Sequence, residues 1–466
     1  MGKEKIFRDP IYGYISIPDE YCKEFIDTPV FQRLRRIEQT SMRVLYPSAR
    51  HDRFAHSIGV YYLGQLAFSY LRKNSEDFFA EKIDDENWEH YRKTFEIACL
   101  MHDCGHSPFS HTFEHYYLYQ REDEIQERIT LFYEDDVNFA KDYASASPAP
   151  HEKISALLLL EQFYGKIKSV GASPELVARM IMGIRHEHNL NTKKKFENKL
   201  ISLLNGSGID VDSLDYIQRD SWASGVNNVI IDYQRLLSAI MIKPDTNKDN
   251  VRIVFKKKVL SVIDNIIIGR NFLYTWIYSH HKVIYEQNLL SKIVEEINKK
   301  NSGFCSKIFS IETFTNAEEL NDNKYYLPTD DDIIHAIKQF AEGDLKIQEF
   351  LSRNHKYKAL WKTHFEFEEH FESVSDRDRL SIAAKIENGE LNEKYGEGNI
   401  LCLKAKPKLK GINKNDFFIE IDEAFVDASV ATSQTSKNLS YFIVYVTENL
   451  RSKKKEIIKD ILSLQA

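Results

Sequence analysis

Residues 94–115 read TFEIACLMHDCGHSPFSHTFEH, and the rest of the chain is organised around this stretch. Most side chains from 95 to 101 are apolar, which predicts a helix that is buried on more than one face. His102 and Asp103 follow at its end, where a glycine and a proline break the helix. A buried imidazole and a buried carboxylate need polar partners or a cation. We therefore expect this helix end to contribute to a metal site.

Length and composition exclude several classes of protein. The chain has 466 residues, 42% hydrophobic and 29% charged, which suits two ordinary domains or one large helical domain with appendages. We expect no membrane span, because no apolar run approaches the roughly 20 residues that a span needs. The formal net charge of -7 does not create the basic field of a general nucleic-acid binder, so nucleic acid is not expected as substrate. Scattered cysteines and an N-terminus without a secretory pattern predict a cytoplasmic location.

Sequence patterns before the central stretch predict a hairpin followed by helices. Residues 5–17 alternate β-prone side chains around a turn, and Thr28 before a proline predicts a helix start for residues 31–39. Residues 51–74 have apolar side chains at helical spacing, which form one face of a predicted helix, and His56 lies at one end of that face. Residues 119–150 are acidic and then rich in small residues, which predicts a surface excursion rather than core.

Patterns after the central stretch predict further helices and then a mixed segment. Residues 210–225 predict a helix with three polar side chains on one face, Asp212, Tyr216 and Asp220. A long helical region then reaches about residue 300 and has the same spacing at Arg270, Tyr274 and Tyr278.

The predicted fold class is mainly α. We predict a catalytic domain over residues 1–300, with a helical core at about 50–225 and a small N-terminal β-hairpin. Turn-forming clusters after residue 300 mark the boundary to an α+β portion, residues 301–466, packed on the core and contributing to oligomerisation.

Four residues from three predicted helices form a ligand set for one cation: His56, His102, Asp103 and Asp212. Two imidazoles and two carboxylates suit Mn, Fe, Zn or Mg and leave coordination positions for water or phosphate. Such a cation polarises a phosphoryl oxygen and lowers the pKa of bound water toward about 7. A lone histidine on an apolar helix face is more often a core residue with hydrogen-bond partners than a metal ligand. The combination predicts a hydrolytic metal site for a phosphate ester.

These residues occur as H, HD and D in the order of the HD-domain phosphohydrolase superfamily, and the surrounding sequence is more specific than that bare pattern. The stretches RFAHSIGV, HDCGHSPFSHTFEH, HEKIS and DVDSLDYIQRD resemble the deoxynucleoside triphosphate (dNTP) triphosphohydrolase branch, including its animal members. The resemblance extends through about residue 290 and is loose beyond it. It implies an HD helical core and metal-dependent cleavage of a dNTP to deoxynucleoside and triphosphate.

The resemblance implies catalytic roles beside the scissile α-phosphate for His106, His111 and His151, with Glu114 orienting the imidazole of His111. A histidine with a pKa near 6.5 can protonate the departing deoxynucleoside oxygen near neutral pH. Two alternatives stay open. His151 is also an ordinary first-turn residue of a helix, and His106, His111 and His151 are also suited to bind a second metal ion.

The resemblance assigns six residues to the substrate: Gln39, Arg53, Tyr216, Asp220, Arg270 and Tyr278. Gln39 would meet the 3′ side of the sugar, and Tyr278 would pack under C2′ and leave no room for a 2′-hydroxyl. Ordinary helix packing is the alternative for the tyrosine and arginine face. Two positions depart from the animal enzyme, because Ser213 replaces a phosphate-binding lysine and Thr40 replaces an apolar residue near the base. Triphosphate affinity and base preference are therefore not predicted.

The resemblance also implies a second, activating site for GTP or dGTP at Lys5, Asp27, Gln32 and Arg35. Asp27 has the acceptors that guanine N1 and N2 need, and Arg35 can stack or pair with phosphate. The alternative is a capped helix with a solvated charged face. Lys256 and Lys258 would add phosphate contacts across a subunit interface, or form a solvated run. Regulation of this type needs a symmetric homo-oligomer, a dimer or a tetramer.

Two rival functions share parts of this pattern. Another HD phosphohydrolase, acting on a monophosphate, a cyclic nucleotide or an alarmone, would use the metal without needing Tyr278 or Arg270. A non-catalytic nucleotide sensor would bind its ligand without turnover. The acidic balance and the presence of His111 and His151 favour an enzyme.

Overall fold

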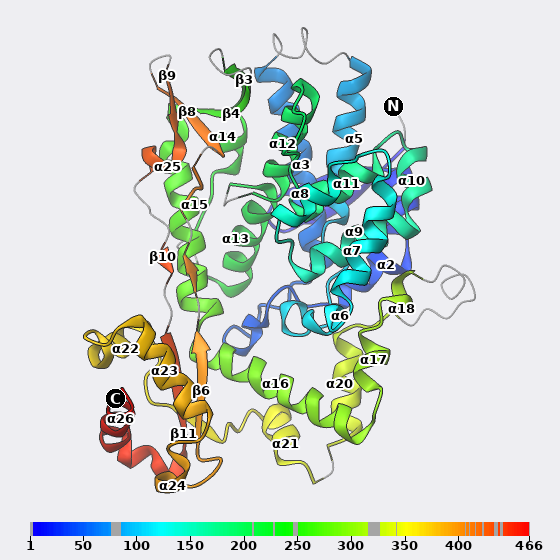
Figure 1. Cartoon of the computed structure of the whole chain (residues 1–466). Coiled ribbons are helices and arrows are strands. Elements are labelled where there is room, and N and C mark those ends of the chain that lie inside the picture. Colours follow the sequence, from blue (N-terminus) through cyan, green and yellow to red (C-terminus); the bar gives the residue numbers. More distant parts are fainter. Residues whose placement is uncertain are drawn as a thin grey trace.

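The fold is mainly α, as predicted, and is seen here in a computed structural model (Figure 1). No described helix is both long and apolar enough to cross a membrane. The structure describes residues 3–75, 85–206, 209–226, 229–245, 250–315, 327–341, 343–405, 407–409, 411–414, 416–421, 424–432, 437–438 and 441–465.

The central part of the molecule is a set of packed helices that includes the predicted HD core. Helix α3 contacts α5 and α13, and α11 contacts α5 and α9. Their bounds are α3 Arg53–Asn74, α5 Asp85–Met101, α9 Pro150–Gln162, α11 Pro174–Met182 and α13 Val211–Ser224. Three of them, α3, α5 and α13, bring the predicted metal ligands toward one another.

Capping residues determine where helices α3 and α13 begin. Asp52 accepts a hydrogen bond from the Ala55 N–H at 2.9 Å, and Asp210 accepts one from the Ser213 N–H at 2.7 Å. These carboxylates satisfy helix N–H groups that have no partner inside the helix. Helix α13 ends at Gly225, whose φ of 73° is accessible to glycine at little cost.

The predicted N-terminal hairpin is confirmed as antiparallel strands β1 (Glu4–Asp9) and β2 (Gly13–Pro18). Thr28 caps α2 (Pro29–Gln32) through the Phe31 N–H, as predicted. The helix continues only as a 3₁₀ turn to Arg36, so the prediction of helix through residue 39 was wrong. Glu38 instead forms an isolated antiparallel bridge with Asp52, and the Gln39 N–H donates to the His51 carbonyl oxygen at 3.1 Å, just before α3 begins.

The prediction that residues 119–150 avoid the core was wrong. They form helices α7 (Glu122–Thr130) and α8 (Phe139–Ser145), joined by the 3₁₀ turn Leu131–Tyr133. Apolar side chains at helical spacing are buried beneath an acidic outer face, and the acidic residues concealed this pattern in the sequence. The buried side chains are Ile125, Ile129, Tyr133, Phe139 and Tyr143.

The predicted long helical region before residue 300 is interrupted. It consists of α15 (Leu260–Phe272), the π-helical turn Leu273–Tyr278 and α16 (His281–Lys300). π-helical turns occur frequently at functional sites. The turn carries Tyr274 and Tyr278 toward the active-site helices, as described below.

Strands from both sides of residue 300 share one sheet. Its order is β3-β4-β8-β9, and β8 pairs in parallel with β4, so the C-terminal portion completes a sheet that begins before residue 260. A second sheet has the order β5-β11-β6. The bounds are β3 Ile240–Asp245, β4 Asn250–Lys256, β5 Tyr357–Ala359, β6 Ile400–Ala405, β7 Lys408–Leu409, β8 Phe417–Ile421, β9 Ala424–Asp427, β10 Lys437–Asn438 and β11 Tyr441–Thr447.

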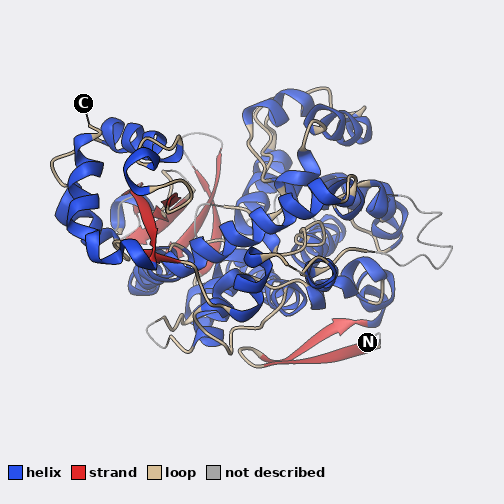
Figure 2. Cartoon of the chain, turned by 90° about the horizontal axis from the view of Figure 1, so that it is seen from below, coloured by secondary structure: helices blue, strands red, loops and turns tan. Residues whose placement is uncertain are grey.

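Shorter helices cover the core and the C-terminal sheet. Figure 2 shows the C-terminal strands on one side of the molecule and the N-terminal hairpin away from them. The domain boundary at residue 300 stays a prediction. The remaining helices are α1 Asp19–Tyr21, α6 His115–Leu118, α10 Tyr164–Ser169, α12 Thr192–Leu204, α14 Tyr233–Leu237, α17 Phe304–Ile308, α18 Glu312–Thr315, α20 Asp330–Gln339, α21 Leu345–Ser352, α22 His364–Phe371, α23 Asp376–Glu387, α24 Asn392–Tyr395, α25 Ala428–Ala431 and α26 Lys454–Ser463.

Close contact between α3 and α13 at Gly59 gives a test of this packing. A methyl group on Gly59 would lie 2.0 Å from Asp215 Oδ1 and 2.4 Å from Arg219 Nη2. Gly59→Ala should therefore lower the free energy of unfolding by about 1–3 kcal/mol, as overpacking does. Chemical denaturation would measure the loss. The control is Gly165→Ala in α10, where no neighbouring atom lies within 4 Å of the new methyl group. Equal stability of the two variants would contradict the packing argument.

Candidate metal centre and active site

The structure brings the four predicted metal ligands together. His56 on α3 has its Nε2 atom 3.0 Å from Asp212 Oδ1 on α13 and 3.3 Å from His102 Nε2. Asp103 Oδ1 lies 3.4 Å from His102 Nε2, and Asp103 Oδ2 lies 3.6 Å from His56 Nε2. His56, His102 and Asp103 are buried, and one ligand atom from each lies within 4.8 Å of the others. A single ion can therefore contact these three residues, and Asp212 Oδ1 lies beside them, 3.0 Å from His56 Nε2 and 3.8 Å from His102 Nε2.

Hydrogen bonds at the other ring nitrogens show that the two histidines suit a cation. His56 Nδ1 lies 2.7 Å from Asp215 Oδ2, and His102 Nδ1 lies 2.9 Å from the carbonyl oxygen of Cys99. Because both partners are acceptors, each Nδ1 carries a proton, which leaves each Nε2 able to present a lone pair to a cation. The two Nε2 atoms lie 3.3 Å apart, close enough to bind one cation between them. The donor set therefore fits a divalent metal ion.

A network behind His56 was missed by sequence reasoning. Arg219 donates to both carboxylate oxygens of Asp215, at 2.8 and 2.9 Å, and to Asp9 at 3.0 Å. This network fixes the ring of His56, as partners of metal-binding histidines commonly do. The available signal was the i, i+4 pair of an aspartate and an arginine on the helix that carries Asp212.

Both carboxylates of the ligand set are ionised at neutral pH. Burial raises the pKa of Asp103, but Arg53, His102 and His106 outweigh burial and hold it well below its usual value. Burial likewise raises the pKa of Asp212, and hydrogen bonds with His102 and His56 outweigh it and lower the pKa. Arg53 Nη1 lies 2.6 Å from Asp103 Oδ2. The ligand set therefore offers negative charge to a cation.

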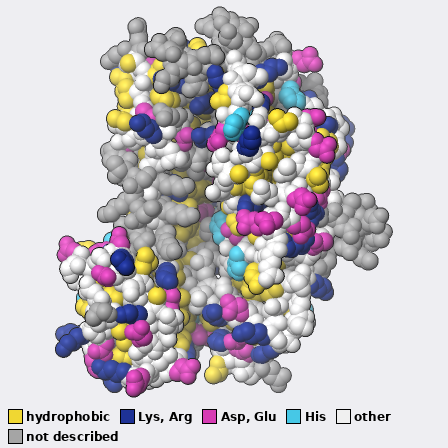
Figure 3. Space-filling view, viewed as in Figure 1, with side chains coloured by type: hydrophobic (Ala, Val, Ile, Leu, Met, Phe, Trp, Pro, Cys, Tyr) yellow, Lys and Arg dark blue, Asp and Glu magenta, His cyan; other side chains and the backbone are white. Residues whose placement is uncertain are grey.

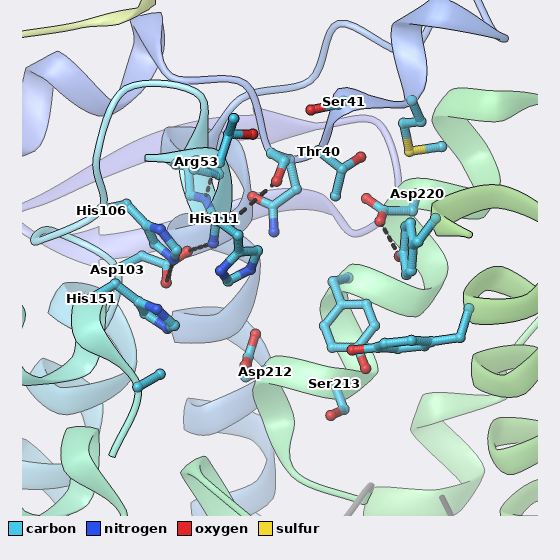
Figure 4. A pocket seen from close by; sticks show the side chains of 18 of the residues that line it. Thr40, Ser41, Arg53, Asp103, His106, His111, His151, Asp212, Ser213 and Asp220 are labelled. Atoms are coloured by element: carbon cyan, nitrogen blue, oxygen red, sulfur yellow. Dashed lines mark hydrogen bonds and ion pairs between the residues drawn. The ribbon is translucent and has the colours of Figure 1, made fainter. Parts of the chain in front are cut away.

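The predicted catalytic residues form a second cluster beside this site. Figure 4 shows His106, His111 and His151 on the side of the pocket where Asp103 lies. Glu114 Oε2 lies 2.8 Å from His151 Nδ1 and 3.3 Å from His111 Nδ1. The rings of His106 and His151 stack with centroids 4.0 Å apart, and His106 Nε2 lies 3.2 Å from Asp103 Oδ1. His106 therefore links the two clusters.

Glu114 controls the charge of this cluster. Burial raises the pKa of Glu114, but its hydrogen bonds with His111 and His151 outweigh burial and lower the pKa. Burial lowers the pKa of His151, and the hydrogen bond and charge of Glu114 outweigh it, so the pKa lies above its usual value. The protonated form of His151 is therefore stabilised, and in that form it can give up a proton to a nearby oxygen.

A cavity of about 440 Å³ opens beside both clusters. This volume lies within the range of small-molecule sites. Gln39 lines it with a buried Oε1 that has no hydrogen-bond partner among the described residues. The lining includes all six predicted substrate residues and both positions that depart from the resembling family: Gln39, Arg53, Tyr216, Asp220, Arg270, Tyr278, Thr40 and Ser213.

Polar contacts organise the wall of the cavity opposite the histidines. The Tyr278 hydroxyl donates to Asp220 Oδ2, and Asp220 Oδ1 lies 2.6 Å from His51 Nε2. Arg270 Nε donates to the Tyr216 hydroxyl at 3.1 Å, and its guanidinium lies 4.3 Å from the centre of the Tyr274 ring. Sequence reasoning missed the role of His51, for which its position two residues before Arg53 was the available signal.

Residues 53–200 match the family model described as the HD domain. This chain contains an HD domain. The match includes His56, His102 and Asp103, whereas Asp212 lies beyond the matched residues and is joined to them by the fold.

Several curated proteins are similar to this HD-domain chain. An uncharacterized protein from Mycoplasma genitalium is 30% identical over 330 residues, covering 68% of this chain and 65% of its own length. An uncharacterized protein from Bacillus subtilis is 29% identical, covering 63% and 56%. The deoxynucleoside triphosphate triphosphohydrolase SAMHD1 from Xenopus laevis is 28% identical over 392 residues, covering 77% and 56%. The chain thus spans less than two thirds of the length of these relatives.

Two solved structures share the fold over nearly the whole HD-domain chain. A hypothetical protein from Aquifex aeolicus has a TM-score of 0.66 at 22% identity and covers 97% of this chain and 99% of its own. A phosphohydrolase from Bacteroides thetaiotaomicron has a TM-score of 0.62 at 20% identity, covering 96% and 100%. The likeness includes the C-terminal portion, which the family model does not match.

The predicted guanine-nucleotide residues of this HD-domain protein form two contacting pairs. Lys5 Nζ lies 2.5 Å from Asp27 Oδ2, and both side chains are nearly half exposed. Arg35 Nε donates to Gln32 Oε1 at 3.0 Å, and its guanidinium lies 3.4 Å from the centre of the Phe54 ring. Lys256 and Lys258 are exposed. The second nucleotide site stays a prediction.

Removing ligands of the HD-domain metal centre should remove the metal. His102→Ala and Asp103→Ala should purify without the ion that the wild type holds. Asp215→Asn should weaken metal affinity about 10–100-fold, because it loosens the ring of His56 without touching the ion. Elemental analysis and titration with Mn²⁺ would measure both effects. His111→Ala serves as the control and should keep one ion per chain. A fall from two ions to one in that variant would instead favour the second-metal alternative.

Proposed function

We propose that this protein hydrolyses a deoxynucleoside triphosphate to deoxynucleoside and triphosphate with a divalent metal ion. The observation that carries the proposal is the convergence of the ligand set, the Glu114-linked histidines and an aromatic-walled cavity at one place. Similarity to proteins named deoxynucleoside triphosphate triphosphohydrolase supports the substrate class. The ion, which is Mn, Fe, Zn or Mg on the chemistry of its ligands, would polarise a phosphoryl oxygen.

The protein's own side chains divide the remaining work. Arg53 holds Asp103 and offers positive charge at the phosphate end of the cavity. His151, which Glu114 holds and whose protonated form it stabilises, would give a proton to the departing deoxynucleoside oxygen. His111 shares the Glu114 carboxylate and is 60% exposed, so it would contact the phosphate chain directly. His106 would support this phosphate contact and keep His151 in place by stacking.

The opposite wall would select the sugar. Tyr278 is held by Asp220, and a ring fixed in this way would exclude a 2′-hydroxyl by close contact with C2′. Gln39 and Asp220 would bind the 3′-hydroxyl, and Arg270 with Tyr216 would contact the triphosphate. Ser213 offers a hydroxyl where the resembling family has a lysine, so the triphosphate would receive less positive charge at this point.

The proposal includes activation by GTP or dGTP at the Lys5, Asp27, Gln32 and Arg35 site, in a homo-oligomer. Its support is that these four polar side chains lie in contacting pairs with exposed charge. Nucleic acid is not proposed as a substrate. On the face shown in Figure 3, Lys and Arg side chains are interspersed with Asp and Glu rather than gathered into a basic surface.

The reaction product tests the proposed function. Wild-type protein incubated with each common ribonucleotide and deoxynucleotide, with Mn²⁺ and with or without GTP, should release triphosphate from dNTPs only. Phosphorus NMR would separate triphosphate from pyrophosphate and orthophosphate. Tyr278→Ala should lower discrimination against ribonucleotides, because it removes the ring under C2′. Turnover of a monophosphate, cyclic nucleotide or alarmone instead would support the rival hydrolase, and tight binding without product would support the sensor.

The pH dependence tests the proton donor. His151 acts in its protonated form, and its pKa is raised, so kcat should fall as the pH rises through that value. Glu114→Gln removes the carboxylate that raises the pKa and leaves the burial that lowers it, so the alkaline fall should move to lower pH. Measuring kcat against pH for both proteins would show the shift. Glu127→Gln on the exposed face of α7 is the control, and an unshifted Glu114→Gln profile would refute the assignment.

A further inference from the structure

A buried carboxylate from the C-terminal portion reaches the active-site loops. Asp330, the first residue of α20, is 8% exposed. Its Oδ2 accepts a hydrogen bond from the Glu38 N–H at 2.9 Å, and its Oδ1 accepts one from the Phe109 N–H at 2.6 Å. One side chain thus joins two loops that precede it by 292 and 221 residues.

One of these loops has a backbone that needs such support. Phe109 and Ser110 have φ values of 55° and 51°, in the left-handed region that non-glycine residues rarely adopt. Residues in such conformations persist when the surrounding structure holds them. The Asp330 bond to the Phe109 N–H is one constraint, and the Ser110 hydroxyl adds another by donating to the Glu38 carbonyl oxygen at 2.5 Å. The two loops therefore hold each other around Asp330.

The same loops hold Arg53 against the metal site. Arg53 Nε donates to Ser110 Oγ at 3.0 Å, and Nη2 donates to the Gln39 carbonyl oxygen at 3.2 Å. Its remaining nitrogen, Nη1, contacts Asp103 at 2.6 Å. Two of the three anchors of the guanidinium thus lie in the loops that Asp330 joins. Loss of Asp330 would release these anchors together.

Helix capping does not explain a buried carboxylate at this position. The cap of α20 is made by Thr329 and Asp332, because Asp332 Oδ2 accepts from the Thr329 N–H at 2.7 Å and from its hydroxyl at 2.9 Å. Asp331, between them, is exposed. The three successive aspartates therefore differ in what they contact, although they share one helical turn.

We propose that Asp330 is a positioning residue, which sets the loops at residues 38–39 and 109–110 and through them the contact of Arg53 with Asp103. The segment after residue 300 is then part of the active site, although the family match ends at residue 200. The kinetic consequence rests on the proposed function, whereas the structural one does not. Asp330 is not among the residues that line the cavity, so it would act through the loops that it joins.

The three aspartates supply a matched experiment. Asp330→Asn keeps the size of the side chain but turns one acceptor into an NH₂ group that faces a backbone N–H. It should increase hydrogen exchange at the Glu38 and Phe109 amides and lower kcat for the dNTP at least about 10-fold, with a smaller change in KM. Asp331→Asn should change neither quantity. Asp332→Asn should lower the melting temperature but should leave kcat and hydrogen exchange at the Glu38 and Phe109 amides unchanged.

Each outcome decides the proposal. The proposal is overturned if Asp330→Asn shows the same hydrogen exchange and kcat as the wild type. It is also overturned if hydrogen exchange rises uniformly over the protein, as in a merely destabilised variant. If Asp330→Asn does not fold, Asp330→Glu keeps both acceptors but displaces them by one methylene, and the same local rise in exchange is expected. If the wild type hydrolyses no nucleotide, the proposed function fails alone, because exchange at the two amides still tests the positioning role.

Discussion

The metal centre depends on the hydrogen bond between Asp215 and His56. This bond holds a proton on Nδ1 and turns Nε2 toward His102 Nε2, 3.3 Å away, where both nitrogens can bind one cation. Arg219 and Asp9 support the carboxylate, so the orientation of one imidazole is connected to the N-terminal hairpin. The hairpin and two core helices thus share one buried charge network.

The candidate active site keeps metal binding and proton donation apart, because each group of residues has different neighbours. On the metal side, Arg53, His102 and His106 lower the pKa of the buried Asp103, and His102 and His56 lower the pKa of the partly exposed Asp212, so both carboxylates stay ionised. On the acid side, Glu114 lies between two imidazoles and keeps a proton on His151. His106 touches both sides, through Asp103 and through stacking. Because the two sides meet at one cavity, a phosphate group there would contact both.

The C-terminal portion contributes to this arrangement rather than only covering it. Its strand β8 completes the sheet begun by β3 and β4, and α20 delivers Asp330 to the loops around Arg53. Arg33 joins the same regions, since it donates to the carbonyl oxygens of Pro328 and Cys104. The shared fold of the two solved structures extends over this portion, whereas sequence similarity to a family model stops earlier.

Residue order alone was enough to predict the helical fold class and the hairpin, because helical periodicity and turn patterns are local properties. The ligand set stays a prediction: residue order supplied the residue types, and the fold brings these distant residues together. It misjudged residues 119–150, where charged side chains concealed a buried apolar face. Packing was needed to reveal Asp215, His51 and Asp330. Their hydrogen-bond partners are 159, 169 and up to 292 residues away, and no local pattern encodes a contact that forms only when distant segments meet.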